Sequence, residues 1–273
     1  MPELPEVEVV RRGVEAAATG RRVREVIVRV PALRWPVPQD LDSLLRGRVL
    51  LSARRRGKYL LLHFEPGALI IHLGMSGTFT WIAPDTPLKR HDHLDLVLEG
   101  GILRLNDPRR FGAVLWQSAR AEPLEEHALL RGLGVEPLGQ DFDGALLHRA
   151  TRGRRGSIKA LLLSGAAVVG VGNIYASESL FRAGISPGTA AGRLSRPRCE
   201  RLALAIRETL VDAIAAGGST LKDFVASDGS TGHFQLESRV YGRQGQPCLQ
   251  CSTPIRRRVQ QQRATYWCPR CQH

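Results

Sequence analysis

The sequence predicts an α+β protein of two domains, an antiparallel β-sandwich or barrel followed by a helical domain, with a four-cysteine module closing the chain. Three observations predict this organisation. Between residue 21 and about residue 125, short hydrophobic runs with a period of two recur between turn residues. Beyond that point the hydrophobic period becomes helical, and the last block holds two close cysteine pairs. With 273 residues, 43% of them hydrophobic, the chain can form two cores.

An amphipathic helix is expected over residues 5–19. Val7, Val10 and Val14 recur at helical spacing, Pro5 suits a first turn, and Gly20 ends the segment. Short strands are expected to follow, at residues 26–30, 49–51, 59–64, 69–73, 78–82, 94–98, 102–105 and 113–116.

Two local features belong to this strand region. Gly100-Gly101 separates two apolar runs and predicts a two-residue hairpin. The basic stretch from Arg54 to Lys58 is expected to lie between two strands. We predict a first domain at 1–131 and a linker rich in Gly, Pro and acidic residues at 132–144.

The second domain is predicted to be helical over residues 145–238. Its clearest helix carries Leu202, Ile206, Leu210 and Ile214 on one face and ends at Gly217-Gly218. A zinc module is predicted at 239–273, because Cys248, Cys251, Cys268 and Cys271 form two Cys-x2-Cys pairs sixteen residues apart. Four thiolates complete a tetrahedral zinc shell, so the ion would be structural. Disulfides are disfavoured in a reducing cytosol, a redox CxxC needs no second copy, and Cys199 is expected to pack in a helix.

The charge predicts a polyanionic partner. Lys and Arg number 39 against 26 Asp and Glu, a net charge of +13 with a pI near 10.5. Nucleic acid is a better partner than a membrane, although a basic soluble surface would have the same composition. Three arginine-rich clusters, at 54–58, 149–159 and 256–263, would suit one anionic ligand; each alone is also typical of a solvated face. No apolar run reaches the ~18 residues of a membrane span, and no leader is recognisable, so a cytoplasmic protein is expected.

Two loops and one glycine segment invite a nucleic-acid interpretation. Arg109 and Phe111, in Asp107–Gly112, could fill the gap left when a base is extruded from a duplex, and Met75 could join them. The alternative is a plain hairpin turn with Phe and Met in the core. Gly170–Tyr175 offers backbone N–H groups to a phosphate, but lacks the strand and acidic residue of a dinucleotide site.

The N-terminal residues carry the candidate chemistry. Methionine is usually trimmed before a small residue, which would leave Pro2 as a terminal secondary amine; such α-amino groups titrate near ~8 and are nucleophilic at neutral pH. Condensed with a sugar aldehyde, the amine gives a cationic iminium, and Glu3 and Glu6 lie within one turn to exchange protons. The same residues would also make an ordinary helix entrance.

The motifs together resemble formamidopyrimidine-DNA glycosylase, the bacterial enzyme that excises 8-oxoguanine and ring-opened purines. The resemblance runs end to end through PELPEVE, RRRGKYLL, HLGMSG, KRHDH, NDPRRFG, VVGVGNIYASESLF, GGSTLKDF, VYGRQGQPC and the four cysteines. PELPEV and DPRRFG distinguish it from the endonuclease VIII group, which prefers oxidised pyrimidines. The family fold is an N-terminal β-sandwich with an N-terminal helix, a helical domain with a helix-two-turn-helix motif, and a zinc β-hairpin.

The resemblance implies specific roles. Pro2 resembles the nucleophile at C1′, Glu3 the general acid with Glu6 in support, Lys58 a phosphate-contacting lysine that assists β-elimination, and Arg263 an arginine that grips phosphates and serves δ-elimination. The remaining DNA contacts match His91, Arg154, Lys159 and Asn173, and the residues filling the vacated stack match Met75, Arg109 and Phe111.

The implied reaction is base excision followed by β- and δ-elimination, leaving a one-nucleotide gap with phosphates at both ends. The implied partner is damaged double-stranded DNA, bound by a monomer with one zinc ion and without a membrane. A damage sensor without chemistry and a lyase for oxidised pyrimidines are the rival functions. His233 replaces a more usual tyrosine in the Asp228–Phe234 loop that closes over the base in the family, which leaves the fine lesion preference open.

Overall fold

The computed structural model describes residues 1–218 and 238–273. The chain divides into two compact units. The first contains Met1–Arg131 together with Gly217 and Gly218, and the second contains Gly132–Ala216 and the C-terminal residues. The Asp228–Phe234 loop, with His233, lies outside the described residues. Among the described helices, none is long and apolar enough to cross a membrane.

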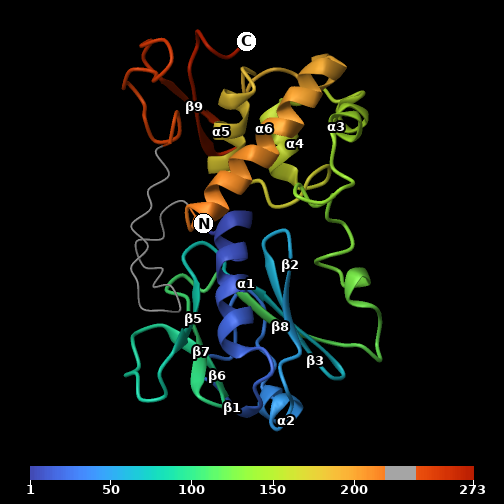
Figure 1. Cartoon of the computed structure of the whole chain (residues 1–273), viewed down its shortest axis with the longest axis vertical. Helices are drawn as coiled ribbons and strands as arrows, with labels where there is room; N and C mark the ends of the chain where they lie inside the picture. Colours follow the sequence, from blue (N-terminus) through green and yellow to red (C-terminus); the bar gives the residue numbers. More distant parts are fainter. Residues whose placement is uncertain (219–237) are drawn as a thin grey trace. The chain divides into compact units, whose positions relative to one another are not determined.

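The first unit is a sandwich of two four-stranded antiparallel sheets (Figure 1). One sheet has the order β1-β6-β7-β5 and the other β2-β3-β4-β8. The strands are β1 (Val23–Val28), β2 (Ser52–Arg56), β3 (Tyr59–Phe64), β4 (Gly67–His72), β5 (Thr78–Ile82), β6 (Asp92–Leu98), β7 (Gly101–Asn106) and β8 (Ala113–Ser118). The described part of this unit also contains a short helix α2 (Leu41–Leu45) and a 3-10 turn (Leu124–Glu126). The predicted sandwich is therefore confirmed.

Helix α1 (Leu4–Ala18) closes one side of this sandwich. It contacts β2 of one sheet and β5 of the other, the strands at which the two sheets end. Val7, Val10 and Val14 are at most 2% exposed and join the core formed by both sheets. Burying a valine contributes roughly 1.5–3 kcal/mol, so this apolar face fixes the helix and, with it, the N-terminal residues.

Four sequence predictions need correction. The strand expected at 26–30 runs from Val23 to Val28, and that expected at 49–51 is only a bridge from Val49 to Arg22. Arg54–Arg56 are strand residues of β2 and do not lie between strands; β2 ends a sheet, where one side of a strand can carry charges. The β6–β7 turn is Glu99-Gly100, because Gly101 already pairs with Leu98.

In its described residues, the second unit contains four α-helices and one β-hairpin. The helices are α3 (Gly144–Thr151), α4 (Ile158–Ser164), α5 (Asn173–Arg182) and α6 (Arg196–Ala215), with a 3-10 turn at Ala191–Arg193. α6 packs against α3 and α5, and α5 also contacts α4 and the hairpin strand β10. The hairpin consists of β9 (Arg256–Gln260) and β10 (Arg263–Trp267). Cys199 is fully buried in α6, as predicted.

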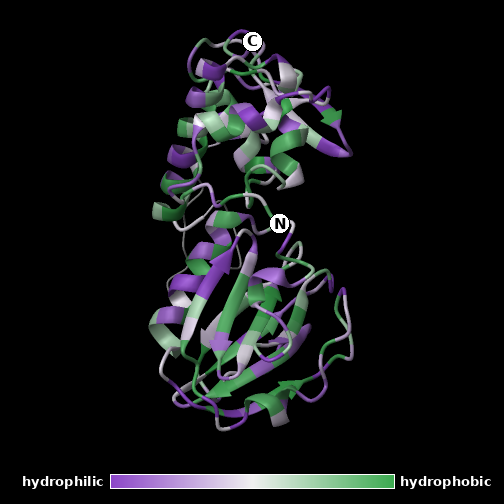
Figure 2. Cartoon of the chain, turned by 90° about the vertical axis from the view of Figure 1, so that its right-hand side faces the viewer, coloured by the Kyte–Doolittle hydropathy of each residue, from purple (hydrophilic) through white to green (hydrophobic). Residues whose placement is uncertain are grey.

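Hydropathy follows this architecture (Figure 2). In the first unit the inward positions of β3 and β4 are apolar; Leu60, Leu62 and Leu69, for example, are completely buried. In the second unit the hydrophobic face of α6 predicted from its 3.6-residue period is buried, while its other face keeps charged residues. Binary patterning alone thus places most of the core.

Candidate active site and nucleic-acid interface

The N-terminal turn is buried and holds two carboxylates. Pro2 is buried, and Glu3 and Glu6 are only 2% and 4% exposed. Glu3 is the N-cap of α1 and forms a capping box with Glu6, whose carboxylate accepts the Glu3 backbone N–H at 2.8 Å. The helix entrance expected from the sequence is therefore real. It also carries two glutamates, a residue type that is almost never fully buried unless it is paired.

Gly218 lies against the same carboxylate. A Cβ atom added to Gly218 would lie 3.2 Å from both Cγ and Oε1 of Glu6, and Gly218 has φ +91°, a value that side chains seldom adopt. The sequence marked Gly217-Gly218 only as the end of a helix. The structure adds a second function for Gly218, which is to leave room for Glu6.

Lys58 lies in the tight β2–β3 turn after Gly57, which has φ +58°. Its charge acts on His72 of β4: burial, then Lys58 and Arg34, lower the pKa of His72 to about 4. His72 is consequently neutral near pH 7, and its Nδ1 accepts the Gly74 backbone N–H at 3.0 Å. The turn thus places a lysine beside an uncharged histidine.

The preceding arginine, Arg55, has a structural partner. Its Nε lies 3.1 Å from Glu8 of α1. Although burial acts to raise it, the pKa of Glu8 is lowered by hydrogen bonds from Arg11, Arg12 and Arg55. Arg54 is exposed, so the basic cluster at 54–58 is divided between helix packing and the surface.

The three predicted stack-filling residues lie on two loops of the first unit. Met75 is 37% exposed and Phe111 48% exposed, which excludes the alternative that they are core residues. The Arg109 guanidinium lies over the Phe111 ring, 4.8 Å from its centroid. His91 follows the 83–90 loop with φ +74°, and its carbonyl accepts the Asp107 backbone N–H. The first unit thus brings Met75, Arg109, Phe111 and His91 onto connected loops.

In the second unit, two predicted DNA contacts converge on the hairpin. Lys159 Nζ donates to Thr265 Oγ1 at 2.7 Å and to the Ala264 carbonyl at 3.2 Å, and Asn173 Nδ2 donates to the same carbonyl at 3.0 Å. Ala264 follows Arg263, which is exposed on β10. Lys159 itself is only 1% exposed. The structure therefore places Lys159 as a support of the hairpin, and its direct contact with DNA stays a prediction.

Glu178 of α5 is a residue to which the sequence analysis gave no role. It is 5% exposed and accepts three backbone N–H groups, from Arg239, Val240 and Tyr241, at 2.8–3.1 Å. These contacts fix the start of the segment that leads into the hairpin. The available signal was an acidic residue in the otherwise small and apolar ASESLF stretch.

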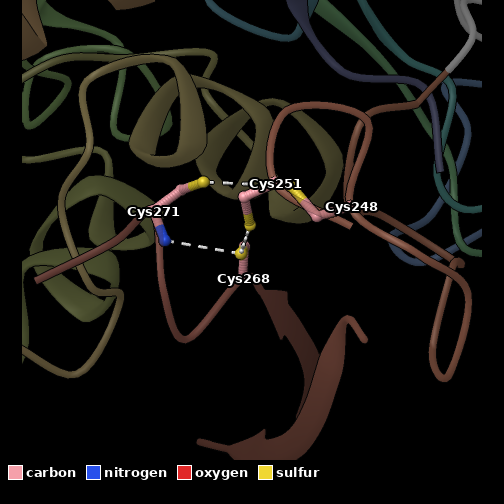
Figure 3. Close-up of side chains that lie close together, drawn as sticks. All are labelled: Cys248, Cys251, Cys268 and Cys271. Atoms are coloured by element: carbon pink, nitrogen blue, oxygen red, sulfur yellow. Dashed lines mark hydrogen bonds between the residues drawn. The ribbon is translucent and has the colours of Figure 1, made fainter. Parts of the chain in front are cut away.

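The four cysteines form a zinc site (Figure 3). Their sulfur atoms lie within 4.8 Å of one another, with 3.9 Å between Cys248 and Cys271 and 3.5 Å between Cys251 and Cys268. A zinc ion with Zn–S bonds of about 2.3 Å needs tetrahedral S···S spacings of about 3.8 Å. The chain therefore binds one structural zinc ion, and the buried Gln272 ties the site to the Ile185 carbonyl.

The other basic residues of this unit line its surface. Arg154 and Arg155 are exposed in the middle of the α3–α4 connection, and Arg256, Arg257 and Arg258 are exposed on β9. Arg258 stacks on Trp267 at 5.0 Å, and Gly188 lies so near that a Cβ there would clash with the guanidinium. These clusters can contact phosphates without reading sequence.

A basic hairpin beside a four-cysteine zinc site and a buried acidic turn that follows Pro2 are features of a DNA-processing enzyme with a zinc finger. All three parts of the chain match one family. Residues 1–114 match the formamidopyrimidine-DNA glycosylase N-terminal domain, 133–225 its H2TH domain, and 245–273 the zinc finger found in FPG and IleRS. The chain belongs to the formamidopyrimidine-DNA glycosylase family and is a DNA glycosylase.

Known relatives agree over their whole length. Formamidopyrimidine-DNA glycosylase of Bordetella avium is 58% identical over 273 residues, covering 100% of this chain and 99% of the relative. That of Burkholderia multivorans is 59% identical, with 100% of both chains covered. Among solved structures, the MutM (FPG) protein of Thermus thermophilus has 41% identity and a TM-score of 0.87, covering 99% of this chain and 98% of the other. A mutant of Lactococcus lactis FPG in complex with Fapy-dG DNA has 34% identity and a TM-score of 0.92, with 100% of both chains covered.

Proposed function

We propose that this DNA glycosylase excises 8-oxoguanine and formamidopyrimidines from duplex DNA and then cleaves the strand at the abasic site. The family membership and the Lactococcus complex with Fapy-dG DNA support the substrate class. A second Lactococcus complex, 35% identical over 99% of both chains with a TM-score of 0.91, contains abasic-site DNA and supports the second step. The observation that carries the proposal is the buried turn in which Glu3 and Glu6 adjoin Pro2.

The first step breaks the glycosidic bond. After removal of Met1, the Pro2 nitrogen forms a bond to C1′, the base leaves with the electrons of the C1′–N bond and gains a proton, and Glu3 protonates O4′ as the sugar ring opens. Glu6 holds the Glu3 backbone N–H at 2.8 Å and so keeps the acid beside the nucleophile. The result is an iminium between Pro2 and the opened sugar.

The second step cuts the strand. The iminium accepts electrons when a C2′ proton is removed, so the 3′-phosphate leaves by β-elimination and the 5′-phosphate by δ-elimination. Lys58 assists the first elimination and Arg263 the second. His91, Arg154 and Asn173 hold phosphates, and Met75, Arg109 and Phe111 fill the vacated stack. We further propose that the protein acts as a monomer in the bacterial cytoplasm.

Borohydride trapping tests the nucleophile. The protein is reduced with a duplex carrying 8-oxoguanine opposite cytosine, and the adduct is mapped by mass spectrometry; we expect Pro2, with Met1 absent. An adduct on Lys58 would keep the activity and replace the nucleophile. Tight lesion binding without any adduct, in protein lacking Met1, would favour a damage sensor without chemistry.

Substitution tests the acid. Glu3→Gln should lower base excision by about 10²–10⁴-fold, the usual contribution of a general acid. Glu8→Gln is the matched control, because Glu8 lies on the same helix but pairs with arginines. Equal losses in the two variants would show that the effect comes from helix stability.

A further inference from the structure

The two loops that carry the stack-filling residues, the Met75 loop (73–77) and the Phe111 loop (107–112), contact each other at a pair of glycines. A Cβ atom on Gly74 would lie 2.5 Å from the Gly112 nitrogen, and one on Gly112 would lie 2.7 Å from the His72 carbonyl. Distances below 3.0 Å leave no space for any side chain at either position. The backbones of the Met75 loop and the Phe111 loop are therefore in direct contact.

Asp107 holds the second loop in shape. It is completely buried, and its carboxylate accepts the Gly112 N–H at 2.8 Å and the Arg109 N–H at 3.3 Å. Its own backbone is fixed from both sides: the N–H donates to the His91 carbonyl at 3.1 Å, and the carbonyl lies 3.0 Å from His93 Nε2. A buried carboxylate between two N–H groups makes strong, directional hydrogen bonds.

The first loop has its own support. The Gly74 N–H donates to His72 Nδ1, and the Gly77 N–H donates to the Leu73 carbonyl at 2.9 Å. The Gly112 carbonyl accepts the Arg34 N–H at 3.0 Å, so Gly112 is held on both its backbone groups. Backbone hydrogen bonds, buried or partly buried, thus hold the two loops, while the side chains of Met75, Arg109 and Phe111 on them are exposed.

We propose that Asp107 is a positioning residue that, with the Gly74–Gly112 contact, makes the two loops one preorganised wedge. This inference rests on the proposed function, in which Met75, Arg109 and Phe111 occupy the space of the extruded base. The backbone of a rigid wedge is already ordered before it enters the base stack. The free energy of its interaction with DNA is therefore not reduced by the cost of ordering the loops, and more of it is available to drive base extrusion. Asp107 touches no substrate and acts through the loop.

Asp107→Asn is the principal test. Asparagine has the same shape but offers one acceptor oxygen and one NH2 group, so one of the two loop hydrogen bonds is lost and two donors face each other. We expect excision of 8-oxoguanine from duplex DNA to fall about ten- to a hundredfold, the loss typical of a small misplacement. β-Elimination on a single-stranded oligonucleotide with a preformed abasic site, which needs no extrusion, should fall far less.

The matched control is Asp42→Asn. Asp42 also accepts a backbone N–H, that of Val26 at 2.7 Å, but it lies at α2. It should leave the ratio of duplex excision to single-strand elimination unchanged. An equal fall of both activities in Asp107→Asn would show a merely structural role and overturn the inference.

A double-mutant cycle tests the unity of the wedge. If the loops act as one body, Met75→Ala and Asp107→Asn together should reduce excision by less than the product of the single losses. Losses that multiply would mean independent loops. If Asp107→Asn folds poorly, His72→Leu replaces it as the test: it removes the acceptor of the Gly74 N–H in the other loop without adding a side chain at the glycine contact, and it should reproduce the selective loss. Wild-type protein without excision would refute the proposed function, whereas undiminished excision in folded Asp107→Asn would refute the wedge alone.

Discussion

Removing one hydroxyl, by Thr265→Val, should expose how the zinc hairpin is held to the helices. Thr265 Oγ1 accepts from the Lys159 ammonium at 2.7 Å, and the two side chains are 0% and 1% exposed. A hydrogen bond to a charged group contributes about 1.5–3 kcal/mol. Because the Ala264 carbonyl at 3.2 Å remains as an acceptor, we expect the free energy of unfolding to fall by about 2 kcal/mol.

The decisive measurement is urea denaturation of four proteins: wild type, Thr265→Val, Lys159→Met and the double variant. Methionine keeps much of the lysine volume and carries no charge. With methionine at position 159, replacing Thr265 by valine therefore does not take a hydrogen-bond acceptor away from a buried charge. Thr265→Val should therefore be nearly harmless in the Lys159→Met background. A loss of stability that is the same with lysine or methionine at position 159 would refute the reasoning.

Three further predictions concern the zinc ion, His72 and Gly218. Removal of zinc with a chelator should unfold the β9–β10 hairpin, which can be followed by circular dichroism, and should weaken the binding of duplex DNA. Unchanged affinity of the metal-free protein for duplex DNA would contradict a structural role for the ion. Burial, Lys58 and Arg34 lower the pKa of His72 from 6.5 to about 4, so below pH 6.5 the unfolded chain binds a proton that the folded chain does not. The free energy of unfolding should therefore be highest above pH 6.5 and should fall by on the order of 3 kcal/mol as the pH drops to 4. This pH dependence should be missing in His72→Gln. Gly218→Ala should lower the free energy of unfolding by about 1–2 kcal/mol, because alanine is strained at a φ of +91°. The added Cβ should also displace Glu6 and so lower the rate of base excision. An unchanged rate would show that Gly218 does not influence the general acid through Glu6.

Asp95 and Arg104 form a buried ion pair in the first unit that the hydrophobic pattern of the sequence does not predict. Asp95 pairs with Arg104 at 2.8 Å and Arg29 at 2.6 Å, and, although burial acts to raise it, these hydrogen bonds lower the pKa of Asp95. Arg104 also holds the Thr86 and Pro87 carbonyls, which anchors the loop before His91. In the sequence these residues look like the polar side of an alternating strand.

Local patterns determined what depends on neighbours in the chain. The period of two gave the sandwich, Val7, Val10 and Val14 gave α1, and the Cys-x2-Cys pairs gave the zinc site, because each signal is complete within a few residues. The end-to-end motifs gave the family. The misplaced β2 strand and the shifted turn at Glu99-Gly100 are errors in strand boundaries, which the hydrogen-bonded pairing between strands decides.

Tertiary structure alone decided which residues pack against the proposed site residues. Lys159 reaches Thr265 across 106 positions, Gly218 lies against Glu6, and Gly74 meets Gly112, and in each case packing sets the contact. A lysine, a glycine or an aspartate such as Asp107 has the same composition signal whether it is buried or exposed. The role of such a residue depends on whether its polar groups are buried away from water and on which hydrogen-bond partners then lie within reach. Both are fixed only when distant segments of the chain pack together.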